Sequence, residues 1–216
     1  MEAQFEALSE LVKNGQKLNF GQDFFVKFYQ AFLYSDRWQQ YIKGVGTTLL
    51  VTAIALVLGV VLGAIVAMVR VGYAQQKPHH RNPILGVLNA VCQVYVTVIR
   101  GVPVVVLLLI FYFIIMTSAE GITVGILTFG INSGAYMAEL IRGGINSVDR
   151  GQMEAGRSLG MSKLQAMRKI IFPQALRYIL PAIGNELIAL LKETAVAGYV
   201  AVVDLTRAGN LVRNNT

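Results

Sequence analysis

The chain has 216 residues, of which 55% are apolar and 14% are charged, and its formal net charge is +7. Soluble domains are typically about 45–50% apolar and about 25% charged. The composition therefore excludes a disordered or collagen-like chain and argues against an ordinary water-soluble globule. A basic excess can indicate nucleic-acid binding in a soluble protein, whereas in a membrane protein it more often reports cytoplasmic loops, so the positions of the charges decide.

The first 43 residues carry equal numbers of acidic and basic residues. Phe5, Leu8, Leu11 and Val12 fall on one helical side, which predicts a short surface helix. Aromatic residues follow that suit the belt at a membrane surface: Phe24, Phe25, Phe28, Tyr29, Phe32 and Trp38. We expect residues 1–43 to form an extracytoplasmic segment.

Long charge-free stretches follow, and each is close to the length that a membrane helix needs. Residues 44–69 contain no charge and predict a first span at about 45–69. Residues 82–119 contain only Arg100 and are too long for one span, so Pro83 and Gly101–Pro103 are expected to interrupt them. We predict an interfacial helix at 83–92, a span at about 93–117 kinked near Pro103, and a third span at about 122–141 after a tight outer turn.

A fourth span is predicted at about 177–203, although this stretch contains Glu186, Lys192 and Glu193. Ionisable residues inside a membrane usually face protein or a wet cavity. The alternative is a helix that lies on the bilayer surface.

The segments 70–81 and 142–177 hold most of the excess positive charge. The positive-inside rule then places both in the cytoplasm and the amino terminus outside. No aromatic–basic patch supports a nucleic-acid interface. His79 and His80 lack acidic or thiol neighbours and Cys92 is the single cysteine, so we expect neither a metal site nor an intrachain disulfide.

Residues 149–173 predict two short helices joined at Leu159–Met161, with Ser162 as the N-cap of the second and Pro173 as its end. The second helix carries an apolar stripe made of Leu164, Met167, Ile170 and Ile171. Such a hairpin could rest on lipid headgroups or dock a soluble partner, and periodicity alone does not separate the two.

Part of this hairpin resembles the EAA loop of ABC importer permeases, through Glu154-Ala155-Gly156, Gly160 and Ile170–Pro173. Gly156 stands where the family has Ala, and Phe172 where it has Leu. Other matches resemble the polar amino-acid branch of the family: Arg100-Gly101-Val102-Pro103, Asn132–Glu139, Arg142–Ile145, Gly151-Gln152, Asn185-Glu186 and Leu191–Thr194. Together they extend over about residues 44–210.

Two departures from the branch stand out. Leu107 occupies a position where the branch often has Gln, which removes a polar group. The family also has a fifth membrane helix after the Leu205-Thr206-Arg207 segment, whereas this sequence stops at Thr216. Either the sequence is truncated or the helix is lacking; we favour truncation and assign residues 205–216 to an extracytoplasmic tail.

The resemblance implies an all-α polytopic membrane protein with a type I importer permease domain at 44–204, in a bacterial inner membrane. The chain contains no G-x-x-x-x-G-K-[ST] loop, so ATP and Mg are expected on a separate ATP-binding subunit dimer. The other expected partners are a second permease, identical or related, and an extracytoplasmic amino-acid-binding protein. No catalytic residues are expected.

The resemblance also implies roles for particular residues. ATPase coupling is expected from Gly151, Gln152, Glu154, Ala155, Gly156, Arg157 and Gly160, and gating or kinking from Arg100, Gly101 and Pro103. The solute pathway is expected to involve Thr128, Asn132, Tyr136, Glu139 and Glu186.

Thr128, Asn132, Tyr136 and Glu139 share one narrow helical face, which could contact a zwitterionic solute or make interhelical hydrogen bonds. Glu139 is expected to pair with Arg100 or Arg142. Glu186 and Glu193 are either pathway residues or partners of Lys192. The alternative function is a permease-like scaffold or channel subunit without ATP-driven transport.

Overall fold

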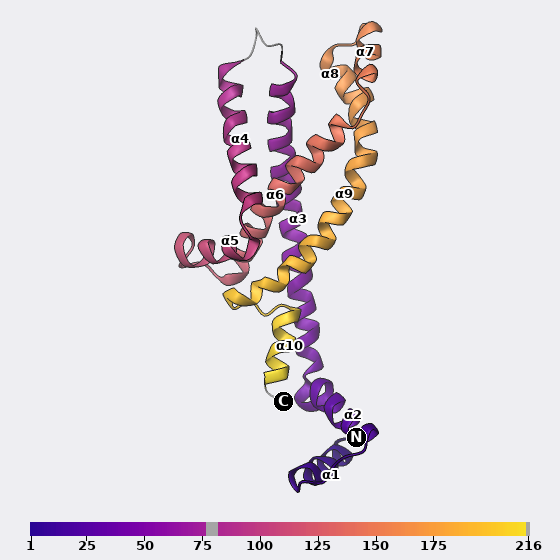
Figure 1. The fold of residues 1–216 in the computed structure, drawn as a ribbon, viewed down its shortest axis with the longest axis vertical. Helices are drawn as coiled ribbons and strands as arrows, with labels where there is room; N and C mark the ends of the chain where they lie inside the picture. Colours follow the sequence, from indigo (N-terminus) through magenta and orange to yellow (C-terminus); the bar gives the residue numbers. More distant parts are fainter. Residues whose placement is uncertain (77–81, 215–216) are drawn as a thin grey trace.

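The computed structural model describes residues 1–76 and 82–214, and within these ranges the chain is helical and contains no strand. The molecule is elongated (Figure 1). Both termini lie at one end, and the helices of the predicted hairpin lie at the other.

The N-terminal segment folds into α1 (Glu2–Lys13) and α2 (Phe20–Phe28), followed by a π-helical turn, η1 (Tyr29–Leu33), and a 3-10 turn, η2 (Tyr34–Asp36). Phe5 and Leu8 are buried, and the Phe5 ring stacks on Tyr29 with 4.6 Å between ring centroids. Val12 is 50% exposed. The predicted helix is therefore present, but its buried face is narrower than the apolar stripe.

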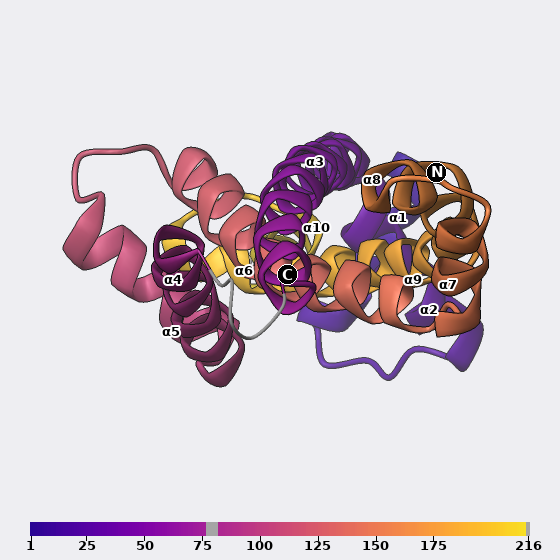
Figure 2. The ribbon, with the colours of Figure 1, turned by 90° about the horizontal axis from the view of Figure 1, so that it is seen from above.

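Three helices among the described residues are long and apolar enough to cross a membrane: α3 (Trp38–Ala74), α4 (Pro83–Gly101) and α6 (Gly121–Asn146). α3 packs along α6, and α4 lies against both (Figures 1 and 2). Many apolar side chains of α3 and α4 remain exposed in the isolated chain, as expected of helices that face lipid or another subunit.

The prediction of an interfacial helix at 83–92 and a kinked span at 93–117 is wrong about the helix boundaries. α4 is one helix from Pro83 to Gly101, and Asn82 caps it by accepting a hydrogen bond from the Ile84 amide at 2.9 Å. Pro83 occupies the first turn, where a missing N–H costs nothing, so it starts the helix and does not break it. The interruption at Gly101–Pro103 is present, because Val102 is extended and α5 (Val104–Ile110) leaves in a new direction, ending in the π-helical turn η4 (Phe111–Ile115).

Glycines allow α3 and α6 to approach closely. A Cβ atom built on Gly63 would lie 2.4 Å from the Met137 Cβ, and one on Gly59 would lie 2.7 Å from the Ser133 Oγ. The main core continues from this contact to α5 and α9, and includes Leu108, Phe129 and Leu190. The pair Gly59 and Gly63 thus fixes the spacing of the two helices on which the polar residues lie.

The predicted hairpin consists of α7 (Arg150–Ser158) and α8 (Lys163–Ala166) with the π-helical turn η5 (Met167–Ile171). Ser162 caps α8, and its Oγ accepts from the Gln165 amide at 3.2 Å, which confirms the predicted N-cap. Pro173 does not end this helix, because it falls in the first turn of α9 (Phe172–Glu193), where proline is tolerated. Leu164 is 77% exposed, so it lies off the buried stripe that Ile171 joins.

α9 packs beside α6 and continues into the 3-10 turn η6 (Thr194–Val200). α9 is not among the helices that qualify as spans by length and composition, so the fourth crossing stays a prediction. Residues 205–214 form α10 (Leu205–Asn214), which packs on the start of α3. The Leu205 amide donates to Thr48 Oγ1 at 3.2 Å.

The two segments predicted to be cytoplasmic meet at one end of the molecule. Lys163 of α8 donates a hydrogen bond to the carbonyl of Gln75, at the end of α3. Of the predicted loop at 70–81, residues 77–81 lie outside the described residues, and with them His79 and His80.

Candidate functional site: a polar face on α6

The predicted polar stripe on α6 is largely buried. Thr128 and Asn132 are 1% and 3% exposed, and Tyr136 and Glu139 are half-buried. In the part of the chain that the structure describes, Thr128 Oγ1 has no hydrogen-bond partner. Buried polar atoms are usually satisfied, so this hydroxyl is free to bond water or a solute.

Two carboxylates of α9 meet this face. Asn132 Nδ2 donates to Glu193 Oε2 at 3.2 Å, and Ser133 Oγ donates to Glu186 Oε1 at 3.1 Å. Among the described residues Lys192 forms no ion pair with either glutamate, so the alternative in which it is their partner is wrong. The contacts are interhelical hydrogen bonds, and they also bring two acceptor groups beside the stripe.

A cavity of about 480 Å³ lies next to the C-terminal half of the stripe, between α4, α6 and the end of α3. Its polar lining comprises Arg70, Gln93, Thr97, Arg100, Tyr136 and Glu139. The Arg100 guanidinium lies over the Tyr136 ring, 5.0 Å from its centroid, in a cation–π contact. Both charge signs and several hydrogen-bonding groups therefore face one space of the size that small-molecule sites have.

Glu139 is held by two arginines. Its carboxylate accepts from Arg142 at 2.6 Å and forms an ion pair with Arg70 of α3. The expected pairing with Arg142 is confirmed, the pairing with Arg100 is wrong, and Arg70 was missed because it lies 69 residues away in sequence. The signal in the sequence was that Arg70 ends the longest charge-free stretch.

The three residues expected to gate or kink the chain lie where α4 ends. Arg100 and Gly101 form its last turn, and Pro103 precedes α5. The redirection of the chain keeps Arg100 beside Tyr136. The structure thus brings together Arg100, Tyr136 and Glu139. Thr128 and Asn132 lie further towards the start of α6, and Glu186 lies on α9.

The residues expected to couple to an ATPase form the hairpin at the far end of the molecule. Asp149 caps α7 by accepting from the Gly151 amide at 2.7 Å, and Gly160 has φ +81°, a conformation that favours glycine. Arg157 Nη1 donates to the Met161 carbonyl at 2.8 Å and closes the turn. Gln152, Glu154 and Ala155 are exposed.

The structure explains why glycine, and not the family's alanine, stands at position 156, which the sequence pattern did not reveal. It is buried, and a Cβ on it would lie 2.8 Å from Ile170 Cδ1 and 3.2 Å from Ala166 Cβ. Glycine in place of alanine therefore lets α7 pack closely on α8 and η5. At the tip, Leu159 and Leu164 are 79% and 77% exposed, which leaves an apolar end without a partner in the described chain.

No group of three or more His, Cys, Asp or Glu side chains is placed to hold a metal ion within residues 1–76 and 82–214.

Comparison with known proteins gives consistent matches. The family model described as "Binding-protein-dependent transport system inner membrane component" matches residues 83–216. A putative glutamine transport system permease protein of Rickettsia typhi is 36% identical over 89% of this chain and 83% of its own length. A probable amino-acid ABC transporter permease protein of Bacillus subtilis is 35% identical over 79% of this chain and 72% of its own length.

Two solved structures resemble the fold. A crystal structure of an amino acid ABC transporter with histidines superposes with a TM-score of 0.75 at 36% identity, covering 92% of this chain and 84% of the other. A methionine ABC transporter in an inward-facing conformation gives a TM-score of 0.67 at 23% identity, over 82% and 86% of the two chains. The second likeness concerns the fold alone.

Proposed function

Because the chain belongs to the family of binding-protein-dependent transport system inner membrane components, as an ABC importer permease of the polar amino-acid branch, we propose that it forms the solute pathway for a polar amino acid. It is an integral inner-membrane protein and a transport subunit. The observation that carries the proposal is the polar face of α6, where Asn132 bonds Glu193 and Ser133 bonds Glu186 between otherwise apolar helices.

This face suits a zwitterion. An ammonium group needs acceptors, which the carboxylates of Glu186 and Glu193 supply, and a carboxylate needs donors, which Arg100 and Asn132 supply. In the low dielectric of a membrane interior, polar groups that already satisfy one another can exchange partners with a solute at little net cost, because no group is left unpaired.

Uptake measurements test this role. The chain is reconstituted in liposomes with its ATP-binding subunit and amino-acid-binding protein, and labelled amino acids are supplied outside. Asn132→Ala and Glu186→Gln are expected to lower uptake by at least tenfold while the complex still assembles. Thr52→Val, which removes a buried hydroxyl with no hydrogen-bond partner among the described residues, is expected to leave uptake unchanged. Uptake at the normal rate in both pathway variants would contradict the proposal.

The hairpin is proposed to couple the chain to the ATP-binding subunit, which would hold ATP and Mg. The exposed apolar tip at Leu159 and Leu164 and the charged flank at Glu154 and Arg157 support this, because an ordered, half-apolar hairpin needs a surface to cover it. Coupling then means that nucleotide-driven closure of the partner shifts the population of inward-open and outward-open states.

Association measurements test the coupling role. Leu164→Glu is expected to reduce copurification with the ATP-binding subunit, because it places a charge in the covered tip. Phe20→Glu, at an equally exposed apolar position on α2, is the control and should copurify normally. If the complex assembles but its ATPase activity ignores the binding protein and amino acid, a scaffold or channel role is favoured.

We propose that a second permease, identical or related, completes the transporter. The exposed apolar side chains of α4 and α5 support this, since lipid or a neighbouring subunit must cover them. The amino terminus is proposed to lie outside.

A further inference from the structure

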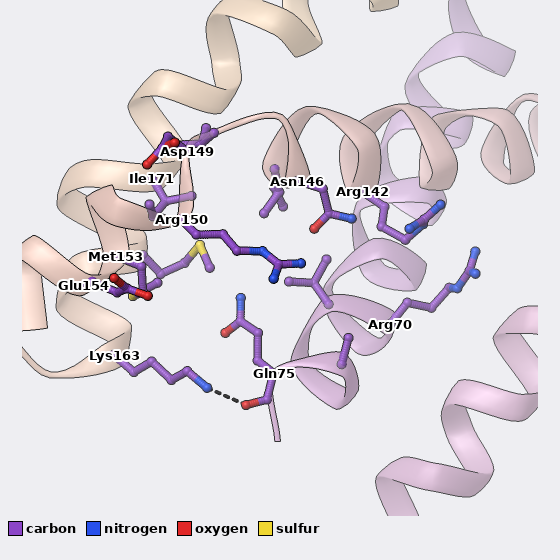
Figure 3. A pocket seen from close by; sticks show the side chains of 15 residues that line it. Arg70, Gln75, Arg142, Asn146, Asp149, Arg150, Met153, Glu154, Lys163 and Ile171 are labelled. Atoms are coloured by element: carbon purple, nitrogen blue, oxygen red, sulfur yellow. Dashed lines mark hydrogen bonds between the residues drawn. The ribbon is translucent and has the colours of Figure 1, made fainter. Parts of the chain in front are cut away.

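A second, larger cavity lies where the coupling hairpin meets the ends of α3 and α6. Its volume is about 670 Å³, and its lining comes from α3, α6, α7, α8 and η5 (Figure 3). Arg70 lines both this cavity and the 480 Å³ cavity beside Tyr136, whereas Glu139 lines only the smaller one.

Four cations from four helices line this cavity: Arg70, Arg142, Arg150 and Lys163. Figure 3 shows Arg150 reaching from α7 into the space, with Arg70 and Arg142 on the opposite side. Arg70 and Arg142 share the carboxylate of Glu139, and Lys163 donates to a carbonyl. Arg150 has no hydrogen bond or ion pair with any described residue.

The acids around the cavity do not neutralise it. The lining carries two, Asp149 and Glu154. Both keep their charges, Asp149 while it accepts from the Gly151 amide at the α7 cap, so the lining has four cations against two acids. The Glu139 carboxylate, which pairs with Arg70 and Arg142, still leaves an excess of one positive charge. The cavity therefore keeps an excess of positive charge, and the exposed Arg150 guanidinium has no partner in the described chain, which together suit an anion.

The position of the cavity along the helices indicates the anion's source. Arg70 is the first charge after the uncharged stretch 44–69, and Arg142 follows the uncharged part of α6, so both mark the polar edge of the membrane-crossing segments. Apolar side chains, Val71, Ile145 and Met167 among them, form the rest of the wall. Basic pockets between helices at this depth fit anionic lipid headgroups.

We propose that this cavity binds a phosphate group, carried by the headgroup of an anionic phospholipid, between Arg150 and Lys163 on one side and Arg70 and Arg142 on the other. Guanidinium groups bind phosphate oxygens in a bidentate manner. A bound headgroup ties the coupling hairpin to α3 and α6. Free inorganic phosphate has the same chemistry, and the experiment separates the two sources.

The test measures the midpoint of thermal unfolding of the purified full chain in zwitterionic detergent. A ligand that binds only the folded state raises this midpoint, and the rise grows with the logarithm of one plus the ratio of the free ligand concentration to Kd. The probes are dihexanoyl phosphatidylglycerol, dihexanoyl phosphatidylcholine and inorganic phosphate. Phosphatidylglycerol is expected to raise the midpoint and phosphatidylcholine to leave it unchanged. If inorganic phosphate raises the midpoint and competes with phosphatidylglycerol, the cavity binds phosphate groups and free phosphate is a second source of them.

Charge-neutral variants locate the binding. Arg150→Gln is expected to raise the apparent Kd for phosphatidylglycerol by about fivefold, the effect of one basic residue near an anionic headgroup. Lys163→Gln is expected to have the same effect, and it replaces Arg150→Gln in the test if that variant does not fold. Arg168→Gln, an exposed cation on η5 outside the lining, is the matched control and should bind as the unmodified chain.

Three results would overturn the proposal. In the first, phosphatidylcholine stabilises the chain as much as phosphatidylglycerol, which would show that the site does not select an anionic headgroup. In the second, Arg168→Gln weakens binding as much as Arg150→Gln, which would show that general surface charge attracts the lipid. Normal lipid binding by both cavity variants, with weakened association of Arg150→Gln with the ATP-binding subunit, would assign the cations to an acidic segment of that partner. None of these measurements depends on which amino acid is transported.

Discussion

Glu139 is the residue that joins α3 to α6 by charge. Its side chain is 19% exposed and Arg70 is 17% exposed, so the pair is shielded from most of the solvent. Removing one member of a largely buried pair is costly because it leaves the other charge without compensation, whereas exposed pairs contribute little.

Glu139→Gln should therefore lower the free energy of unfolding by about 2 kcal/mol. For a chain of this size that corresponds to a fall of roughly 4–8 °C in the midpoint of thermal unfolding, which calorimetry or fluorescence in detergent can measure. Glu120→Gln, at an exposed carboxylate on the residue that precedes the same helix, is the control. Equal midpoints for the two variants would show that the ion pair adds nothing to stability.

At this scale the sequence predicted the polar face of α6 but not most of its partners. The spacing of Asn132 and Tyr136 is a property of one helix, and periodicity reads it directly. The residues opposite, Glu193 and Arg100, belong to other helices, and their pairing depends on crossing angles and contact positions that local spacing does not contain. Arg142 was predictable as a partner of Glu139 because it lies one helical turn away.

The contact between α3 and α6 depends on small residues. Gly63→Ala should destabilise the fold by about 1–3 kcal/mol, because the added Cβ would lie 2.4 Å from the Met137 Cβ and 2.9 Å from the Ala138 amide nitrogen, and a helix backbone cannot move aside as a side chain can. Gly72→Ala, on the same helix with open space around it, should be neutral or slightly stabilising. Thermal unfolding of both variants checks this, and similar midpoints would count against a tight interface.

The hairpin offers a double-mutant test of its packing. Gly156→Ala should destabilise the hairpin by about 1 kcal/mol because the new methyl meets Ile170 Cδ1. In an Ile170→Val background that atom is absent, so the alanine should cost less or stabilise through its helix propensity. Hydrogen exchange of the α7 amides measures the difference. An equal cost in both backgrounds would place the strain elsewhere.

The errors in helix boundaries share one cause. Pro83 and Pro173 were both expected to interrupt or end helices, yet each lies in the first turn of one. A proline breaks a helix interior but suits the first turn, and sequence alone does not say which applies. Pro103 was interpreted correctly because Gly101, two residues before it, also disfavours a continuous helix.

At the scale of the whole molecule, the sequence predicted which segments share an end. The excess of basic residues in 70–81 and 142–177 assigned both segments to one side, and the contact between Lys163 and Gln75 places the described parts of both together. α1 and α10 lie at the opposite end (Figure 1). The distribution of basic residues predicts this arrangement because it determines which side of the membrane each loop occupies, and that prediction does not depend on how the helices pack.

Labelling of single cysteines tests the orientation of that arrangement. In a Cys92→Ser background, Asn14→Cys and Ser158→Cys each introduce one exposed thiol, at the end of α1 and at the end of α7. A membrane-impermeant maleimide should label Asn14→Cys in spheroplasts and Ser158→Cys only in inverted vesicles, since the positive-inside rule puts the hairpin in the cytoplasm. The Cys92→Ser chain should remain unlabelled in both. Labelling of both cysteines from one side would contradict the fold, and the reverse pattern would contradict the assigned orientation.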